Sequence, residues 1–521
     1  MPSTNTPGSR PQADQPDSIG GLLRHTSIYA ITPIFQRLLG LVLVGIYTSV
    51  LPTGEYGLLG LTDLFLALFP LLIGTSLLAG LSRHYFIYED PKDRSSVISG
   101  TAIALIISST LGTIAVLVFR EPITGLLFAV KGHAPNEALV TYVSICALIL
   151  PFSLISRTGF EALQAQKRSK AVVVLSLVRT VLESALKLYF LFGMQMGVLG
   201  FLYAILIGEV LSGSAFAVYI ARVHGVRLVG RTFKPLLLYT IPLVPVGLFQ
   251  LCLHQADKLL LQRLGPTEVV GVGADGVPLT LAREWLGVYN LGYQIPFLFH
   301  AAVMGSFMRI WSPNIFALKN DAASREDVLR IGTLVALAIG GLYAQVALFG
   351  REAIQIIGRQ ESYHAANEIV PWIAFGYVAF ALYGLCQAAL MSVFAVRSLA
   401  ALNAFALAVN LGLNFLWIPE YGYLGAAMAT TASFAALALT SAVLSARKGI
   451  PPFSATSVVT GLLLVAGAAA AGVLIDQSTA PWAIGGLAAK AGVSLTLVGL
   501  LFLSLPSQER ALLLSRIRRA R

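Results

Sequence analysis

The chain has 521 residues, of which 56% are hydrophobic and only 12% are charged, and its mean hydropathy is +0.77. A soluble domain normally carries about 25% charged residues, so this composition excludes a soluble globular protein and indicates a membrane protein. The formal net charge is +11, but the positions of the cations along the chain fit a membrane protein better than a nucleic-acid-binding protein.

The predicted elements are almost entirely membrane-spanning helices. Residues 1–24 are rich in Pro, Ser and Gln and are expected to form a disordered cytoplasmic tail. Fourteen apolar runs follow, each long enough to cross about 30 Å of hydrocarbon at about 1.5 Å per helical residue. They lie near 27–51, 58–82, 97–119, 137–156, 171–194, 196–221, 235–261, 285–308, 331–350, 366–393, 398–418, 421–446, 456–475 and 480–505. We therefore expect an all-α polytopic membrane protein with about 14 transmembrane helices.

The distribution of Lys and Arg predicts the orientation of these spans. With the N-terminus in the cytoplasm, 25 of the 36 Lys and Arg residues fall in cytoplasmic segments, and five fall within spans. The six in outer connections are Arg120, Lys131, Arg263, Arg283, Arg351 and Arg359. This bias follows the positive-inside rule, so both termini are expected in the cytoplasm. The basic tail over 506–521 then anchors the chain at the membrane surface.

An internal repeat divides the spans into two sets. The stretch "MQMGVLGFLYAILIGEV" (194–210) parallels "PEYGYLGAAMATTASFA" (419–435), because each is a short outer turn followed by Gly-x-Leu-Gly and a helix about 225 residues apart. We expect an N-terminal six-helix lobe over 25–222, a C-terminal six-helix lobe over 235–446, and two additional helices over 456–505. Repeats of this kind, with the substrate held between them, are typical of secondary transporters.

The same region carries motifs of a known family. The stretch "TSVLPTGEYGLLGLTDLFLALFPLLIGTSLLAGLSRHYF" (48–86) resembles the signature of polysaccharide transport proteins, the O-antigen and exopolysaccharide flippases. It departs from that signature at Pro52, where Gly is usual, and at an inserted His84. Three further stretches resemble the family, so that the likeness covers about residues 25–450: "IPLVPVGLFQLCLHQADKLLLQRLG", "VYNLGYQIPFLF" and "NFLWIPEYGYLGAAMATTASF".

The resemblance implies a fold and a cargo. Members belong to the multidrug, oligosaccharidyl-lipid and polysaccharide exporter superfamily, with two six-helix lobes around a central cavity and two peripheral helices. They move polyprenyl-diphosphate-linked oligosaccharides from the cytoplasmic to the outer face of the bacterial inner membrane by alternating access, for cell-surface polysaccharide biosynthesis. Membrane lipids and glycan polymerase machinery are the other partners it implies. Extra residues over 266–281 depart from the family, either to touch the sugar or a partner or as a tolerated insertion.

A lipid-diphosphate cargo needs fixed cations in the cavity, since its phosphates must leave water. The candidates are Arg37, Arg83, Arg179, Lys187 and Arg309. Each has a structural alternative. Arg37 either snorkels or pairs with Asp63, and the arginines at positions 83 and 309 either guide the phosphate or anchor the cytoplasmic ends. Arg179 and Lys187 share one helix face with Glu183, where the three either bind cargo or brace the lobe as an ion-pair ladder.

A second group of charged residues predicts a gate or an ion-coupling site. The stretch "LFQLCLHQADKLLLQRLG" (248–265) places His254, Asp257 and Lys258 inside an apolar run, where each charge is costly. Asp257 either pairs across the cavity as a latch between the lobes, couples transport to H⁺ or Na⁺, or contacts the cargo. Glu183 and Glu209 belong to the same group, and Glu209 is a candidate partner for the basic residues of the preceding span. Adjacent helical residues point about 100° apart, so residues 257 and 258 cannot both face one narrow site.

Amide side chains suit the hydroxyl groups of a glycan. Asn403, Asn410 and Asn414 lie on one helix face, and Gln387 lies in the preceding span. These four residues are the candidate glycan contacts, and hydrogen bonding between helices is the alternative.

Several other functions are less consistent with the sequence. No connecting segment carries a metal-ligand cluster, a phosphate-binding loop or a nucleophile with its base, so we expect no enzymatic activity, no metal site and no cofactor beyond a coupling ion. A cation-coupled multidrug exporter of the same superfamily is the main alternative, and it would line its cavity with acids. The lipid II flippase branch also carries anionic cargo, but the quoted motifs resemble the polysaccharide branch more.

Overall fold

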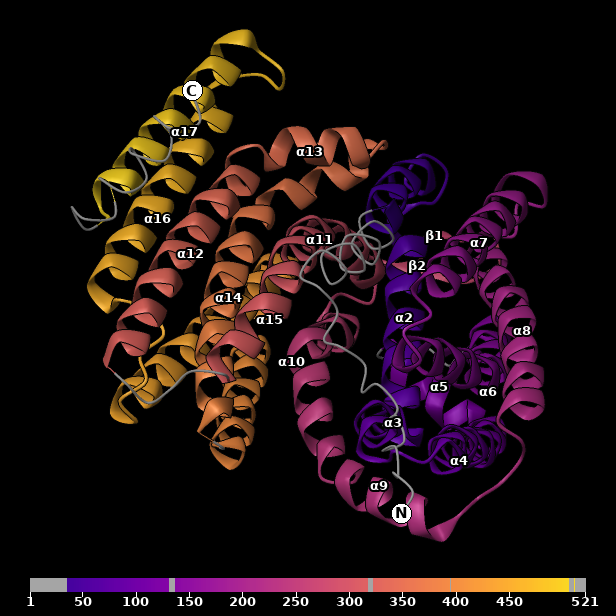
Figure 1. Ribbon diagram of the computed structural model, residues 1–521. Helices are drawn as coiled ribbons and strands as arrows, with labels where there is room; N and C mark the ends of the chain where they lie inside the picture. Colours follow the sequence, from indigo (N-terminus) through magenta and orange to yellow (C-terminus); the bar gives the residue numbers. More distant parts are fainter. Residues whose placement is uncertain (1–34, 131–135, 317–321, 394, 506–509, 511–521) are drawn as a thin grey trace, which may run out of the picture.

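The computed structural model describes residues 35–130, 136–316, 322–393, 395–505 and 510. Both predicted tails lie outside these ranges, apart from residue 510. The described residues form helices and one short β-hairpin. The helices gather into two groups, which we call the first and second lobes, with a final helix pair at the outer edge of the second lobe (Figure 1).

The first lobe contains a helix described over Phe35–Tyr47 and the elements up to α8. Their bounds are α2 Thr53–Ile73, α3 Ser76–Ile87, α4 Pro91–Val118, α5 Arg120–Phe128, α6 Glu137–Ala165, α7 Ser169–Leu188, the π-helical turn η1 Tyr189–Gly193, and α8 Gly197–Val223. The helices α4, α6 and α8 pack side by side. The helix α9, Gly230–Thr240, then connects this lobe to the second.

The second lobe begins at α10 and includes the hairpin. Its elements are α10 Leu243–Leu264, β1 Val269–Val272, β2 Pro278–Thr280, α11 Leu281–Phe316, α12 Ala322–Leu348, α13 Gly350–Ile357, the 3₁₀ helix η2 Glu361–Glu368, α14 Val370–Ser392 and α15 Val396–Arg447. The helices α16, Ala455–Ser478, and α17, Ile484–Leu503, pack on each other and on α12 from outside.

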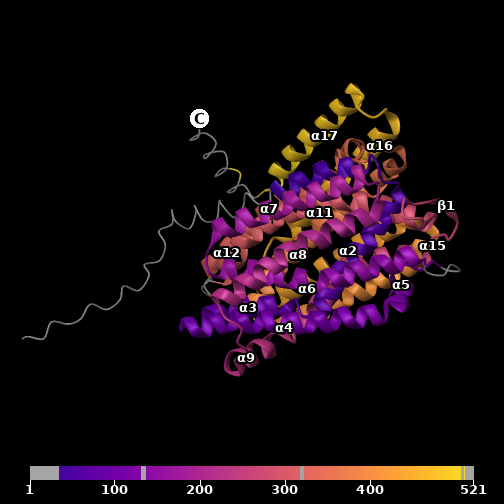
Figure 2. The same cartoon turned by 90° about the vertical axis from the view of Figure 1, so that its right-hand side faces the viewer.

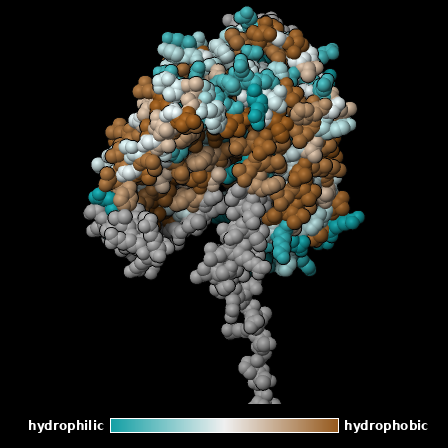
Figure 3. Space-filling model, turned by 90° about the horizontal axis from the view of Figure 1, so that it is seen from above, coloured by the Kyte–Doolittle hydropathy of each residue, from teal (hydrophilic) through white to brown (hydrophobic). Residues whose placement is uncertain are grey.

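The fold class predicted from the sequence, an all-helical polytopic membrane protein, is confirmed. Within the described residues, nine helices are long and apolar enough to cross a membrane, or ten if the bent pair α9–α10 is one span. The helix α15 covers two of the predicted spans. They are separated at Gly422, where the backbone leaves helical geometry (φ 58°, ψ −133°). Apolar side chains form a broad band over the face seen in Figure 3, and polar ones gather mostly toward its two margins. The lobe boundaries predicted at 222, 235 and 446 stay predictions.

The helices run side by side along one axis, with the hairpin at one end of the molecule, which we call the hairpin end (Figure 2). Near that end α2 of the first lobe packs directly against α11 of the second. Three glycines make this approach possible. A Cβ on Gly57 would lie 2.2 Å from the carbonyl oxygen of Arg283, and one on Gly287 would lie 1.9 Å from that of Thr53. A Cβ on Gly60 would lie 1.9 Å from the Asn290 amide nitrogen.

Candidate functional site: a cavity between the lobes

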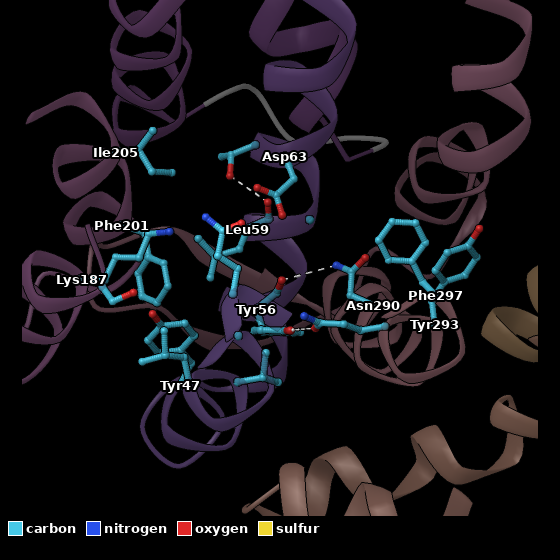
Figure 4. A pocket seen from close by; sticks show the side chains of 18 of the residues that line it. Tyr47, Tyr56, Leu59, Asp63, Lys187, Phe201, Ile205, Asn290, Tyr293 and Phe297 are labelled. Atoms are coloured by element: carbon cyan, nitrogen blue, oxygen red, sulfur yellow. Dashed lines mark hydrogen bonds between the residues drawn. The ribbon is translucent and has the colours of Figure 1, made fainter. Parts of the chain in front are cut away.

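A cavity of about 560 Å³ lies between the two lobes. Its walls come from the Phe35–Tyr47 helix, α2, α7 and α8 of the first lobe and from α10, α11 and α14 of the second. The α2–α11 contact borders the cavity, since Gly60 of α2 and Asn290 of α11 meet at the crossing and also line the cavity. Figure 4 shows the side chains that point into this space.

Aromatic and amide side chains make up much of the cavity wall. The aromatic residues are Tyr47, Tyr56, Phe201, Tyr293, Phe297 and Tyr377, and the amides are Gln36, Gln255, Asn290 and Gln294. Several of these groups bind one another across the space. The Tyr56 hydroxyl donates to Gln294 Oε1 at 2.6 Å (Figure 4), and Gln36 Nε2 donates to Thr180 Oγ1 at 2.7 Å. The wall therefore offers ring faces and neutral hydrogen-bonding groups.

The charged residues of the cavity wall balance one another. Two are basic, Lys187 and Lys258, and two are acidic, Asp63 and Glu183. Lys187 Nζ lies 2.6 Å from Glu183 Oε1 one helical turn away, and over the ring of Phe201 at 5.9 Å. Asp63 on α2 and Lys258 on α10 line the same cavity from different lobes, and their opposite charges attract each other. A ligand entering the cavity can thus find either sign of charge.

The predicted diphosphate cations lie in different places. Lys187 lines the cavity, whereas Arg37 lies near Gly305 of α11 and does not line it. Arg83 is exposed and stacks over the ring of Tyr239 at 4.5 Å. The side chain of Arg309 lies outside the described part of the structure. The role of these residues in binding a diphosphate stays a prediction.

The predicted polar face of α7 is divided between two neighbours. Arg179 pairs with Glu209 of α8 at 2.5 Å and donates to Ser156 Oγ at 3.3 Å. Glu183 and Lys187, one and two turns further on, line the cavity instead. The alternative of a bracing network therefore describes Arg179 and Glu209, while the cavity-facing end of the same helix is available to a ligand.

Asp257 is fully buried within the second lobe. Its carboxylate accepts hydrogen bonds from the hydroxyl of Tyr289 on α11 and from Thr430 Oγ1 on α15 at 3.2 Å. It thus makes these contacts inside one lobe, not across the cavity. Lys258, one residue later, lines the cavity while Asp257 does not, because adjacent residues of a helix point in different directions. His254 lines the cavity and lies 3.3 Å from the Tyr293 hydroxyl.

The predicted glycan-binding amides make contacts inside the second lobe. Asn403 Nδ2 donates to the Tyr383 hydroxyl at 2.8 Å, Asn410 Nδ2 to Ser433 Oγ at 3.1 Å, and Asn414 Nδ2 to Asn410 Oδ1 at 3.0 Å. All three are buried, and neither they nor the half-buried Gln387 line the cavity. The arrangement is the helix-bracing alternative, and glycan contact by these residues stays a prediction.

Most of the neutral polar residues of the cavity were not predicted from the sequence. Asn290 and Gln294 are one helical turn apart on α11, and so are Tyr293 and Phe297. That spacing within an apolar run is the signal that would have found them, because an amide inside a membrane span needs a polar partner. Among the described residues no group of three His, Cys, Asp or Glu side chains is placed to hold a metal ion.

A polytopic helical fold with a polar cavity between two lobes defines a membrane transporter. The family model described as "Polysaccharide biosynthesis protein" matches residues 22–319, more than half of the chain, and the protein belongs to this family. The family consists of transporters without enzymatic function, which agrees with the expected lack of catalysis, and it confirms the resemblance identified from the motifs. No match was found among curated proteins.

Several solved structures of membrane transporters share this fold. The lipid II flippase MurJ in an inward closed conformation has a TM-score of 0.68 at 13% identity, over 92% of this chain and 99% of that one. An inward-facing multidrug resistance MATE transporter has a TM-score of 0.58 at 14% identity, over 81% and 98%. A MOP superfamily transporter from Pyrococcus furiosus has a TM-score of 0.55 at 16% identity, over 82% and 95%. These similarities establish the fold alone.

Proposed function

We propose that this protein is a flippase that carries a lipid-diphosphate-linked oligosaccharide from the cytoplasmic to the outer face of the bacterial inner membrane. Its product would supply a polymerase of cell-surface polysaccharide, such as an O-antigen or exopolysaccharide. The observation that carries the proposal is the cavity between the lobes, whose wall combines aromatic rings with neutral amides and hydroxyls. Family membership supports the same conclusion.

The chemistry of the cavity wall suits the head group of such a cargo. Sugar rings pack their apolar faces on aromatic side chains, and their hydroxyls bind amides such as Asn290 and Gln294. The diphosphate would bind Lys187, which now pairs with Glu183, and Lys258, which shares the cavity wall with Asp63. Because Asp63 and Lys258 belong to different lobes, a diphosphate that displaces Asp63 weakens one attraction between the lobes. Cargo binding would thereby favour the change from one cavity opening to the other.

Cation-coupled multidrug export is the second candidate. The observation in its favour is the pair of acids in the cavity, Asp63 and Glu183, either of which can hold a lipophilic cation beside an aromatic ring. The two candidates differ in the charge that the cargo requires. A flippase depends on Lys258, and an exporter of cationic drugs depends on Asp63.

The test follows lipid-linked oligosaccharides in cells that have or lack the protein, using a membrane-impermeant glycosidase to report which face they occupy. We expect depletion to trap them on the cytoplasmic face, and we expect the variant Lys258→Met to restore at most about a tenth of the flipping, since a charge-assisted contact is worth about 1.5–3 kcal/mol. The matched control is Lys448→Met, which removes an exposed lysine outside the cavity. Normal sidedness on depletion, together with new sensitivity to cationic compounds, would support drug export instead.

A further inference from the structure

The β-hairpin between α10 and α11 belongs to the second lobe but contacts the first. Its strands pair antiparallel, with Val269 opposite Thr280 and Val272 opposite Pro278, and its tip is 273–276. The hairpin lies within 266–281, the segment that the sequence predicts to depart from the family pattern. Its hydrogen bonds to the first lobe lie near the starts of three helices, α2, α6 and α8.

Asp275, at the tip, lies against the first turn of α8. One oxygen of its carboxylate accepts hydrogen bonds from the backbone N–H of Leu199 at 3.1 Å and from the hydroxyl of Tyr142 at 2.6 Å. Leu199 is the third residue of α8, and its N–H is one of the four that a helix cannot satisfy internally. The negative charge also faces the positive end of the helix dipole. A residue of the second lobe therefore caps a helix of the first.

Two other helices of the first lobe begin beside the same tip. Glu55, in the first turn of α2, accepts a hydrogen bond from the backbone N–H of Ala274 at 2.5 Å, and Asn136, before α6, donates to the carbonyl of Gly276 at 3.0 Å. Two glycines permit this closeness. A Cβ on Gly273 would lie 2.7 Å from Glu55 Oε1, and one on Gly197 would lie 3.0 Å from Ala274 Cβ.

The ends of α10 and α11 that flank the hairpin carry arginines. These arginines bind the C-terminal end of a first-lobe helix, whereas Asp275 binds an N-terminal end. Arg263, at the end of α10, donates to the carbonyls of Gly125 and Leu126 at 2.5 and 2.6 Å. Arg283, at the start of α11, donates to the carbonyl of Phe128 at 3.0 Å. These carbonyls belong to the last turn of α5, where cations are favourable. An acid on the N-terminus of α8 and bases on the C-terminus of α5 make the contact electrically complementary.

We propose that residues 262–283 form a latch that holds the two lobes together at the hairpin end and releases when that end opens. The proposal rests on the alternating-access part of the proposed function. The α2–α11 crossing closes this end tightly, so it must separate for the cavity to open there, and the hairpin must then leave the first lobe. The tip is suited to release, because Asp275 is half-buried and Ala274 and Gly276 are exposed, so water can reach the tip as it leaves the first lobe.

The test measures the distance between the lobes at the hairpin end in the purified full chain in lipid nanodiscs. Cys146, Cys252 and Cys386 are first replaced by Ala, and spin labels are then attached at Glu121→Cys on α5 and Glu361→Cys on η2, both exposed and on different lobes. We expect Asp275→Ala to raise the ratio of long to short distances at least about tenfold, because two bonds to a charged group are lost. The control, Glu268→Ala, removes an exposed acid from the same loop and should leave the distances unchanged.

Hydrogen exchange of the first turn of α8 shows whether the hairpin has separated from that helix, because the Leu199 N–H loses its acceptor in the variant. Faster exchange there with unchanged distances between the labels would overturn the proposal, and so would unchanged exchange together with unchanged distances. If Asp275→Ala cannot be purified in a folded state, Asp275→Asn is measured instead, because it keeps the shape of the side chain but removes its charge. We expect it to raise the ratio of long to short distances by a smaller amount. The measurement needs no cargo, so it separates failure of the latch from failure of the flippase assignment.

Discussion

At the scale of single residues, a buried lysine attaches the final helix pair to the second lobe. Lys490 on α17 is 1% exposed, and its ammonium lies 2.7 Å from both carboxylate oxygens of Glu352 on α13 and 2.7 Å from Asp476 on α16. Arg351 adds hydrogen bonds to the carbonyls of Asp476 and Thr479 at 2.7 and 2.9 Å. Two acids and two bases thus join three helices away from the cavity.

Replacing Lys490 with Met should destabilise the protein by about 3 kcal/mol, because it leaves two carboxylates facing each other without their shared cation. The midpoint of thermal unfolding in detergent should fall accordingly. The control is Lys448→Met, an exposed lysine whose loss should change the midpoint little. An unchanged midpoint in the Lys490 variant would mean that the cluster does not attach α16 and α17.

At the scale of elements, the α2–α11 crossing depends on glycine. Gly287→Ala would put a methyl group 1.9 Å from the carbonyl oxygen of Thr53, a backbone atom that cannot turn aside. We expect the helices to move apart, with a loss of about 1–3 kcal/mol of stability and a wider hairpin end in the spin-label measurement.

Gly467→Ala on α16 is the matched substitution for this test, since a Cβ added there would meet no other atom within 4 Å. Because alanine favours a helix by about 1 kcal/mol over glycine, that variant should be as stable as the parent chain or slightly more so. Equal behaviour of the two alanine variants would contradict a packing role for Gly287.

At the scale of the whole molecule, the charge bias predicts which end faces the cytoplasm. In the chain without native cysteines, a cysteine at Val272 on the hairpin, 67% exposed, should react with a membrane-impermeant maleimide in intact cells. A cysteine at Lys448, exposed in the turn before α16, should react only after the membrane is permeabilised. The reverse pattern would invert the proposed orientation and the direction of transport with it.

How much of the site was predictable differs between kinds of residue. Lys187, Glu183, His254 and Lys258 were singled out because a charge in an apolar run is costly, and all four line the cavity. Tyr56 and Gln294 were not, because a neutral side chain carries no charge that would mark it within an apolar run. The three asparagines of α15 were correctly placed on one face by their spacing, but spacing cannot say whether that face meets a cavity or another helix.

The sequence by itself determined the class of the protein, since long apolar runs must become helices in a membrane and since quoted motifs and repeats identify the family. It also determined that residues 257 and 258 point different ways, because helical geometry is local. Only the tertiary structure decided that Asp257 is buried within one lobe while Lys258 lines the cavity that Asp63 of the other lobe also lines. Only it assigned the 266–281 segment to contacts with the ends of α2, α6 and α8. Such contacts join residues far apart in the chain, and no local periodicity records them.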